Sequence, residues 1–286
     1  MEGLQVTWDP IANDPPPGLV PYAVNTPVAI DSSGHDLLGV LHTPGGPGPH
    51  PIVVLLHGIP GNERNFDLAQ ALSRAGYAAL VFHYRGSWGV GGTWSWGHVL
   101  EDSARVVAAV READFAARHR LDPGRLAVIG HSLGGFAALW TAAGDKEIAA
   151  IGSIAGFDFG AATRAAAADP AARAAYVAGF EASLLPLAGT SGEALVAEME
   201  AAGDDWELAR LAGPLADRPV LLLAGARDEV APPGTHHEPL VAAYREHPVA
   251  ALEDGVLPTD HAWSDHRVAL ARTVLGFLDR HMPTAR

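Results

Sequence analysis

The sequence predicts an α/β protein built on a doubly wound, mostly parallel sheet. Strand-like and helix-like segments alternate along most of the chain, and this alternation is typical of right-handed βαβ units. The run at residues 52–56 is apolar at every position, as expected of a parallel strand covered on both faces. The length of 286 residues fits one large α/β domain that carries an insertion.

The elements follow one another in a regular order. A proline-rich segment, residues 1–26, opens the chain; we expect an extended surface arm, because proline disrupts helices. A hairpin follows, with its turn at residues 31–34. The expected strands lie at residues 27–30, 36–42, 52–56, 77–82, 125–129, 148–154, 219–224 and 249–252. The expected helices lie at residues 65–75, 98–118, 133–143, 238–246 and 264–281.

The alternation stops between residues 157 and 213. This stretch is rich in alanine, prone to form helices, and lacks an evident strand. We expect it to form a helical cap, residues 157–213, inserted into a core made of residues 1–156 and 214–286.

Composition excludes several classes of function. Lysine and arginine number 19 against 33 aspartates and glutamates, a net charge of −14, so we expect no nucleic-acid partner. The chain has no cysteine, which excludes disulfides, cysteine-bound metals and a thiol nucleophile. The start of the chain lacks the pattern of a signal peptide, and no apolar run is long enough for a membrane span. We therefore expect a cytoplasmic protein.

A candidate nucleophile lies between an expected strand and an expected helix. Gly130, Ser132 and Gly134 form the pattern G-x-S-x-G at this junction. A preceding strand and a following helix are the context in which this pattern indicates a nucleophile. Glycine fits on both sides of a sharp turn where a side chain would clash, and the following helix directs its positive end at the serine. The pattern therefore predicts a serine nucleophile at Ser132.

This segment resembles the nucleophile turn of the α/β-hydrolase family, and the resemblance extends from about residue 27 to the C-terminus. It implies the α/β-hydrolase fold and a catalytic triad in the order serine, acid, histidine. It also implies an oxyanion hole after the strand at 52–56, where the sequence reads His57-Gly58-Ile59. The two donors would be the backbone N–H groups of Ile59 and Leu133, since Pro60 has no N–H.

The resemblance also points to the acid and the base. Asp228 follows the strand at 219–224 at the position of the family's acid, with Glu229 as the alternative. His261 precedes the last helix, where the family carries its histidine, and His266 is the alternative. Ser264 is expected to begin that helix as its N-cap.

A metal site is the competing interpretation of the histidines. The candidate ligands would be His236, His237 and Glu238 together with His261 and His266. No pair has the i, i+4 spacing of a helical zinc site. We therefore expect neither a metal nor another cofactor.

Together these features predict a serine hydrolase that cleaves the carboxylic ester of a small molecule through an acyl-enzyme. Three alternatives remain open: a peptidase of the prolyl-oligopeptidase type, a hydrolase of carbon–carbon bonds, and a non-catalytic receptor. The first rests on Tyr84-Arg85-Gly86, which resembles a loop of peptidase-like and esterase-like members. We expect a monomer or a homodimer.

Overall fold

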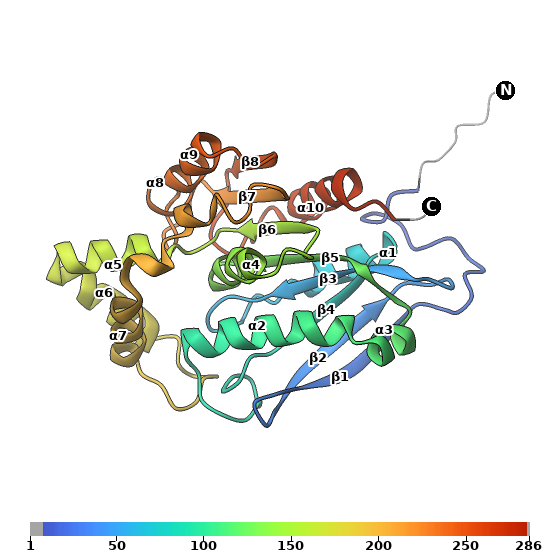
Figure 1. The fold of residues 1–286 in the computed structure, drawn as a ribbon, viewed down its shortest axis with the longest axis horizontal. Coiled ribbons are helices and arrows are strands. Elements are labelled where there is room, and N and C mark those ends of the chain that lie inside the picture. Colours follow the sequence, from blue (N-terminus) through green and yellow to red (C-terminus); the bar gives the residue numbers. More distant parts are fainter. Residues whose placement is uncertain (1–7, 285–286) are drawn as a thin grey trace.

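The computed structural model describes residues 8–284, so residues 1–7 of the expected arm lie outside the described residues. One sheet of eight strands runs through the molecule in the order β1-β2-β4-β3-β5-β6-β7-β8 (Figure 1). The strands from β3 onward are parallel to their neighbours, whereas β2 runs antiparallel to β1 and β4. The strands are β1 (Val24–Ser32), β2 (His35–Thr43), β3 (His50–Leu56), β4 (Ala78–Phe82), β5 (Leu121–His131), β6 (Ala150–Ile154), β7 (Pro219–Gly225) and β8 (Ala251–Leu257).

The expected hairpin is present as β1 and β2. Its turn contains Ser33 and Gly34, both with positive φ (52° and 80°), the combination that matches the twist of a two-residue hairpin loop. Strand β1 begins at Val24, so the expected arm ends earlier than residue 26. The last residues of the expected arm, from Val24 to residue 26, pair with β2 in the hairpin.

Helices cover both faces of the sheet, because alternate strand residues face opposite sides. In β3, Ile52, Val54 and Leu56 pack into one apolar layer and Val53 and Leu55 into the other. The helices of the first layer include α2 (Trp96–Arg111), α4 (Leu133–Gly144) and α9 (Glu238–Glu246). The second layer contains α1 (Phe66–Arg74) and α10 (Arg267–His281). The sheet is therefore doubly wound, as the sequence predicts.

Several expected boundaries are wrong. The single helix at 98–118 is two helices, α2 and α3 (Ala113–His119). Glu112 between them has an extended backbone (ψ 131°), which redirects the chain so that Ala116 packs into the core. The last helix begins at Arg267, and Ser264 instead donates its backbone N–H to Asp260 Oδ1 (2.8 Å). Strand β8 extends to Leu257, well beyond residue 252.

The segment between β6 and β7, residues 157–213, is called the helical insertion below. It contains α5 (Phe159–Ala168), α6 (Pro170–Glu181), α7 (Gly192–Ala202) and two 3₁₀ turns, η1 (Gly203–Trp206) and η2 (Leu208–Leu211). The three α-helices lie together on the left in Figure 1. Each begins with a side chain that caps its first turn. The capping residues are Asp158, Asp169 and Ser191.

Backbone hydrogen bonds join the helical insertion to the loop between β4 and α2, residues 83–95. Trp88 N–H donates to Pro186 O (3.0 Å), and Ala188 N–H donates to Gly86 O (2.8 Å). The Ala188 carbonyl in turn accepts from Trp94 N–H (2.8 Å). The two segments therefore form one continuous structure, although about a hundred residues separate them.

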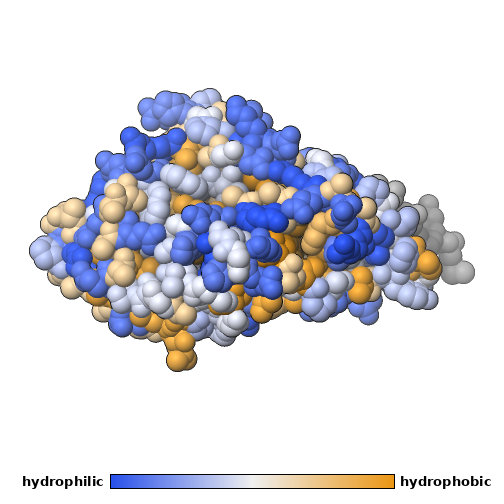
Figure 2. All heavy atoms as spheres, turned by 60° about the horizontal axis from the view of Figure 1, so that its bottom comes forward, coloured by the Kyte–Doolittle hydropathy of each residue, from blue (hydrophilic) through white to orange (hydrophobic). Residues whose placement is uncertain are grey.

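The described surface is mixed in character. Figure 2 shows hydrophilic and hydrophobic residues intermixed over one face of the molecule. No helix within residues 8–284 is both long and apolar enough to span a bilayer.

Candidate active site

Ser132 lies on a strained turn between β5 and α4. Its backbone has φ 58° and ψ −122°, a region that residues with a side chain rarely adopt and that clusters at functional sites. Surrounding hydrogen bonds hold this conformation. Ser132 N–H donates to Ile154 O (2.8 Å), and the Ser132 carbonyl accepts from Gly135 N–H (2.9 Å) and Phe157 N–H (3.2 Å).

Glycines make this turn sterically possible. A Cβ on Gly130 would overlap the backbone of Gly134, and a Cβ on Gly134 would overlap the Leu56 carbonyl. Gly58 belongs to the expected oxyanion-hole loop, and a Cβ on it would lie 2.9 Å from Ser132 Cβ. Gly58 therefore allows the loop after β3 to approach the candidate nucleophile closely.

The expected oxyanion donors lie at this junction. Leu133 is the first residue of α4, and Ile59 follows Gly58 in the loop after β3. Neither backbone N–H donates a hydrogen bond to another described residue. Two donors of this kind beside a serine are suited to stabilising an oxyanion.

Side chains hold the loop after β3 in place. Three of its carbonyls accept side-chain hydrogen bonds, from Tyr84 Oη to His57 O (3.2 Å), from His57 Nδ1 to Gly58 O (2.7 Å) and from Trp88 Nε1 to Pro60 O (2.6 Å). Burial lowers the pKa of His57 to about 3, so this ring is neutral. His57 therefore supports the loop and is not placed as a base.

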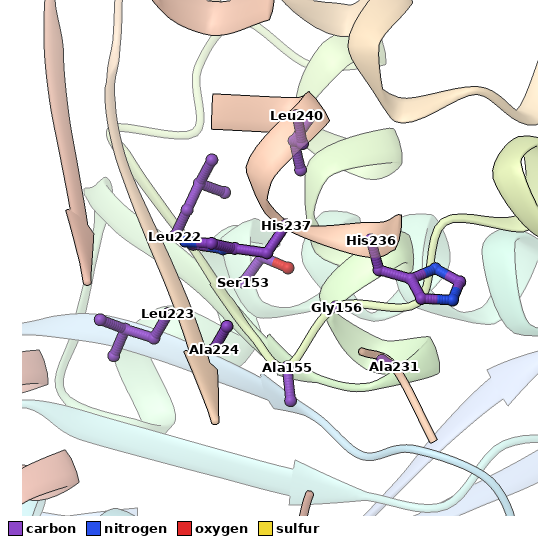
Figure 3. Close-up of a pocket in the computed structure, with 10 residues that line it drawn as sticks. All are labelled: Ser153, Ala155, Gly156, Leu222, Leu223, Ala224, Ala231, His236, His237 and Leu240. Atoms are coloured by element: carbon purple, nitrogen blue, oxygen red, sulfur yellow. The ribbon is translucent and has the colours of Figure 1, made fainter. Parts of the chain in front are cut away.

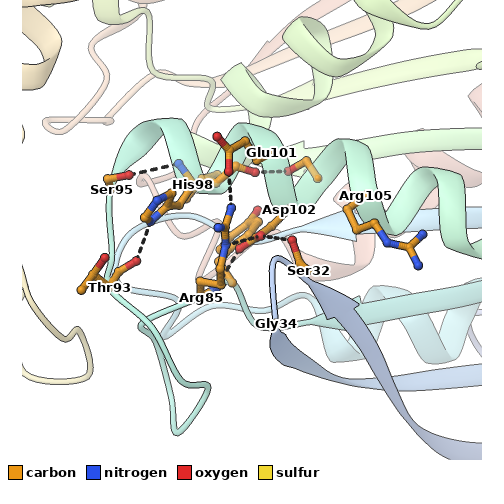
Figure 4. A network of polar contacts seen from close by, with 12 residues as sticks. Ser32, Gly34, Arg85, Thr93, Ser95, His98, Glu101, Asp102 and Arg105 are labelled. Atoms are coloured by element: carbon orange, nitrogen blue, oxygen red, sulfur yellow. Dashed lines mark hydrogen bonds and ion pairs between the residues drawn. The ribbon is translucent and has the colours of Figure 1, made fainter.

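Arg85 anchors the neighbouring loop through a buried ion pair (Figure 4). Its backbone N–H and its Nε both donate to Asp102 of α2, at 2.8 and 2.7 Å, and its Nη2 donates to Glu101 (2.5 Å). Ser32 at the end of β1 also donates to Asp102 (2.7 Å). Asp102 is fully buried. Because these contacts engage the Arg85 guanidinium, its role is to connect the loop, α2 and β1.

Asp228 and His261 form the second half of the site. His261 Nδ1 donates to Asp228 Oδ2 (2.7 Å), and Asp228 Oδ1 accepts from the N–H groups of Val230 and Ala231 (2.9 and 2.7 Å). Burial alone would raise the pKa of Asp228, but the hydrogen bond and charge of His261, with these backbone donors, outweigh it and lower the pKa. The carboxylate is therefore ionised and orients the imidazole.

The alternative residues lie elsewhere. Glu229 is exposed, whereas Asp228 is 4% exposed and directed inward. His266 pairs with Asp265 on the surface, Nδ1 to Oδ1 at 2.9 Å. The geometry thus favours Asp228 and His261 over both alternatives.

Ser132 Oγ and His261 share no hydrogen bond among the described contacts. Such bonds are often long in enzymes without substrate. The link between the serine turn and the histidine loop runs through His131, whose Nε2 donates to the His261 carbonyl (2.7 Å). Sequence reasoning missed this residue, because the variable position of G-x-S-x-G carries no signal of its own.

His236 supports the start of the helical insertion rather than a metal. Its Nδ1 accepts the N–H of Asp158 (3.0 Å), and its ring stacks on Phe157 at 4.6 Å. The described residues contain no group of three or more ligands that could hold a metal ion. His236 and His237 also line a cavity of about 10 Å³ (Figure 3), room for about one water molecule.

The tryptophans near the site differ in role. Trp94 and Trp96 are 2% and 0% exposed and belong to the core. Trp96 packs on Phe159 and Phe180 of the helical insertion, at 4.8 and 5.2 Å between ring centroids. Trp88 is partly exposed beside the loop after β3. Of the three, Trp88 therefore has the most accessible side chain.

Comparisons with known proteins agree with the fold. The family model for the alpha/beta hydrolase fold matches residues 51–209. An esterase from Pyrococcus furiosus is similar over 94% of this chain and 98% of its own, with 18% identity and a TM-score of 0.65. The esterase Est1E from Butyrivibrio proteoclasticus is similar over 91% and 99%, with 20% identity and a TM-score of 0.65.

Two further proteins match this chain over only part of their own length. An acylaminoacyl peptidase from Pyrococcus horikoshii is similar over 93% of this chain but 43% of its own, with 14% identity and a TM-score of 0.66. A protein from Acinetobacter baumannii named quorum-quenching protein AidA is 32% identical over 130 residues. That match covers 43% of this chain and 41% of the relative, so it spans less than half of either protein. The family match, the sheet and the serine turn together establish that the chain belongs to the α/β-hydrolase fold family.

Proposed function

We propose that this protein is a serine hydrolase that cleaves carboxylic esters of small molecules. One observation carries the proposal: a strained, glycine-flanked Ser132 lies beside the loop after β8, whose His261 is already hydrogen bonded to Asp228 of the loop after β7. A serine needs a base to become nucleophilic, and the base needs a partner that sets its tautomer. The contact of Asp228 with Nδ1 leaves Nε2 of His261 as the proton acceptor.

The reaction would proceed in two steps. Ser132 Oγ attacks the ester carbonyl as its proton passes to His261 Nε2, and the N–H groups of Ile59 and Leu133 stabilise the oxyanion. The tetrahedral intermediate collapses, the proton passes from His261 to the departing alcohol, and an acyl-serine remains. Water then gives a proton to His261 and attacks the acyl carbon; the bond to Ser132 Oγ breaks, His261 returns the proton to Oγ, and the acid is released.

The esterases among the similar structures support an ester as the substrate, and the acylaminoacyl peptidase keeps amides as the second candidate. The loop with Arg85 does not favour a peptidase, because this arginine is engaged by Asp102 and Glu101. A panel of p-nitrophenyl esters of graded chain length, run beside aminoacyl-p-nitroanilides, separates the two. We expect turnover of esters; turnover restricted to the anilides would refute the ester assignment.

Labelling tests the mechanism directly. A fluorophosphonate probe should label the wild type and leave Ser132→Ala unlabelled, because only an activated serine reacts. His261→Ala should lower kcat/KM by at least about 10³-fold, whereas the matched control His266→Ala should stay within about threefold. Equal labelling of the wild type and Ser132→Ala, or a larger loss in the His266 variant, would refute the assignment.

A further inference from the structure

We propose that His131 is a positioning residue that sets the place of the base by donating a hydrogen bond to the main chain of His261. The inference rests on the proposed function and concerns the step that brings the base to the nucleophile. His131 is the last residue of β5 and is covalently adjacent to Ser132. Its Nε2 lies 2.7 Å from the His261 carbonyl oxygen, and the two rings are 4.9 Å apart.

The contact determines the tautomer of His131. A carbonyl oxygen can only accept, so Nε2 carries the proton and Nδ1 carries the lone pair. Burial, with a smaller effect from His261, lowers the pKa of His131 to about 4, so the ring is neutral near pH 7. The hydrogen bond is therefore present across the range in which His261 would work as a base.

The other ring nitrogen shows that packing alone does not explain this residue. Nδ1 of His131 is buried and has no hydrogen-bond partner among the described residues. An unpaired buried nitrogen destabilises a folded protein, and an apolar side chain of similar size would avoid that loss. The Nε2 contact is what distinguishes histidine from such a side chain here.

The contact completes a two-point restraint on His261. At the ring, Nδ1 is held by Asp228 (2.7 Å); at the main chain, the carbonyl is held by His131. The bond from Asp228 fixes which way the imidazole faces, but it joins the histidine to the loop after β7 and not to β5. Because His131 is bonded to Ser132, it ties the position of the base to that of the nucleophile. Displacements of about 1 Å at such a site can cost about 10²-fold in rate.

Two substitutions separate the hydrogen bond from the packing. His131→Phe keeps a buried ring and removes the donor. His131→Gln places an amide nitrogen the same number of bonds from Cβ as Nε2 and so keeps the donor. His131→Asn is polar but one bond too short, and it serves as the matched control.

The experiment measures kcat and KM for a p-nitrophenyl ester, the rate of fluorophosphonate labelling, and the Tm of each variant. We expect His131→Phe to lower kcat and the labelling rate by about 10- to 100-fold, with KM within about threefold. His131→Gln should return both rates to within about threefold of the wild type, and His131→Asn should not. If His131→Phe fails to fold, the comparison of Gln with Asn decides the question.

The outcomes distinguish this inference from the proposed function. A wild type that is neither labelled nor active refutes both. A reactive wild type with a fully active His131→Phe refutes only the positioning role. Folded Gln and Phe variants with equal losses, or a loss carried by KM, would also overturn it, because neither follows from a displaced base.

Discussion

Acidification should destabilise this protein strongly, because several histidines are buried in their neutral form, and His57, His131 and His236 are the most deeply buried of those whose pKa falls to about 4 or below. Burial lowers the pKa of His57 to about 3 and those of His131 and His236 to about 4, against about 6.5 in an unfolded chain. The unfolded state therefore binds protons more readily than the folded state between pH 6.5 and 4. The stability of the folded state is complete above pH 6.5 and decreases as the pH falls toward 4.

The size of the effect follows from these values. At pH 5 an unfolded-state histidine is almost fully protonated and the three folded-state rings are almost fully neutral. Each ring then lowers the free energy of unfolding by about 2 kcal/mol, and the three together by about 6 kcal/mol. That sum is comparable to the whole stability of a typical protein, about 5–15 kcal/mol. For a chain of this size it corresponds to a decrease in Tm of roughly 12–24 °C.

Thermal unfolding followed by circular dichroism between pH 8 and 5, at constant ionic strength, measures this decrease. His131→Gln is the internal control, since it removes one of these titrating rings. Its loss of unfolding free energy from pH 8 to 5 should be about 2 kcal/mol smaller than that of the wild type. A wild-type Tm that changes by less than about 4 °C, or a pH dependence that is the same in both proteins, would refute the reasoning.

Three further predictions concern single contacts. Gly134→Ala should lower the free energy of unfolding by at least about 3 kcal/mol in urea denaturation, because its Cβ overlaps backbone. The control is Gly144→Ala, where a Cβ meets nothing within 4 Å. This control should leave the free energy of unfolding unchanged or raise it by up to about 1 kcal/mol. Arg85→Met should lower the free energy of unfolding by about 3–5 kcal/mol in the same assay, because it leaves Asp102 buried without its cation. Adding Asp102→Leu should recover most of that free energy. A double variant that is no more stable than Arg85→Met would contradict this. Asp228→Asn should lower kcat about 10⁴-fold with little change in Tm, by analogy with the serine-protease acid; a loss below tenfold in ester hydrolysis would argue against its role.

Much of the fold could be predicted because its strongest signals are local. The strand at 52–56 is apolar throughout, and β3 is buried at every residue. Helix α9 occupies the range that its pattern predicts. The strand at the edge of the sheet was harder to predict. Strand β8 contains Glu253, Asp254 and Gly255 and is only partly buried, so it lacks the apolar pattern of a strand. Its pairing with β7 comes from the sheet, not from its own residues.

The break between α2 and α3 could not be predicted for a similar reason. Residues 111–113 contain neither proline nor glycine, the usual local signals of a helix end. The chain turns there because Ala116 and Phe115 pack against the core after the turn. Tertiary packing of this kind overrides a continuous helical pattern.

In the candidate site, too, residues with a local sequence signal could be predicted and residues placed by tertiary contacts could not. Ser132 could be predicted because its turn demands glycine at fixed positions, and those glycines lie within the sequence motif itself. Choosing Asp228 over Glu229 depends on which carboxylate faces inward, and adjacent residues on a loop give no periodicity to decide it. The contact of His131 with His261 joins residues 130 positions apart, and no local pattern indicates such a pairing.

The backbone hydrogen bonds between Trp88 and Pro186, and between Gly86 and Ala188, bear on how this scaffold could be recombined with its relatives. Residues 83–95 hold the loop after β3 through Trp88 Nε1, and the same residues pair with the helical insertion. A chimera that exchanges residues 157–213 alone would therefore mismatch a main-chain junction and disturb the Ile59 loop at a distance. A unit for exchange therefore comprises at least two segments, 83–95 and 157–213, and donor sequences for a chimera should be chosen as pairs.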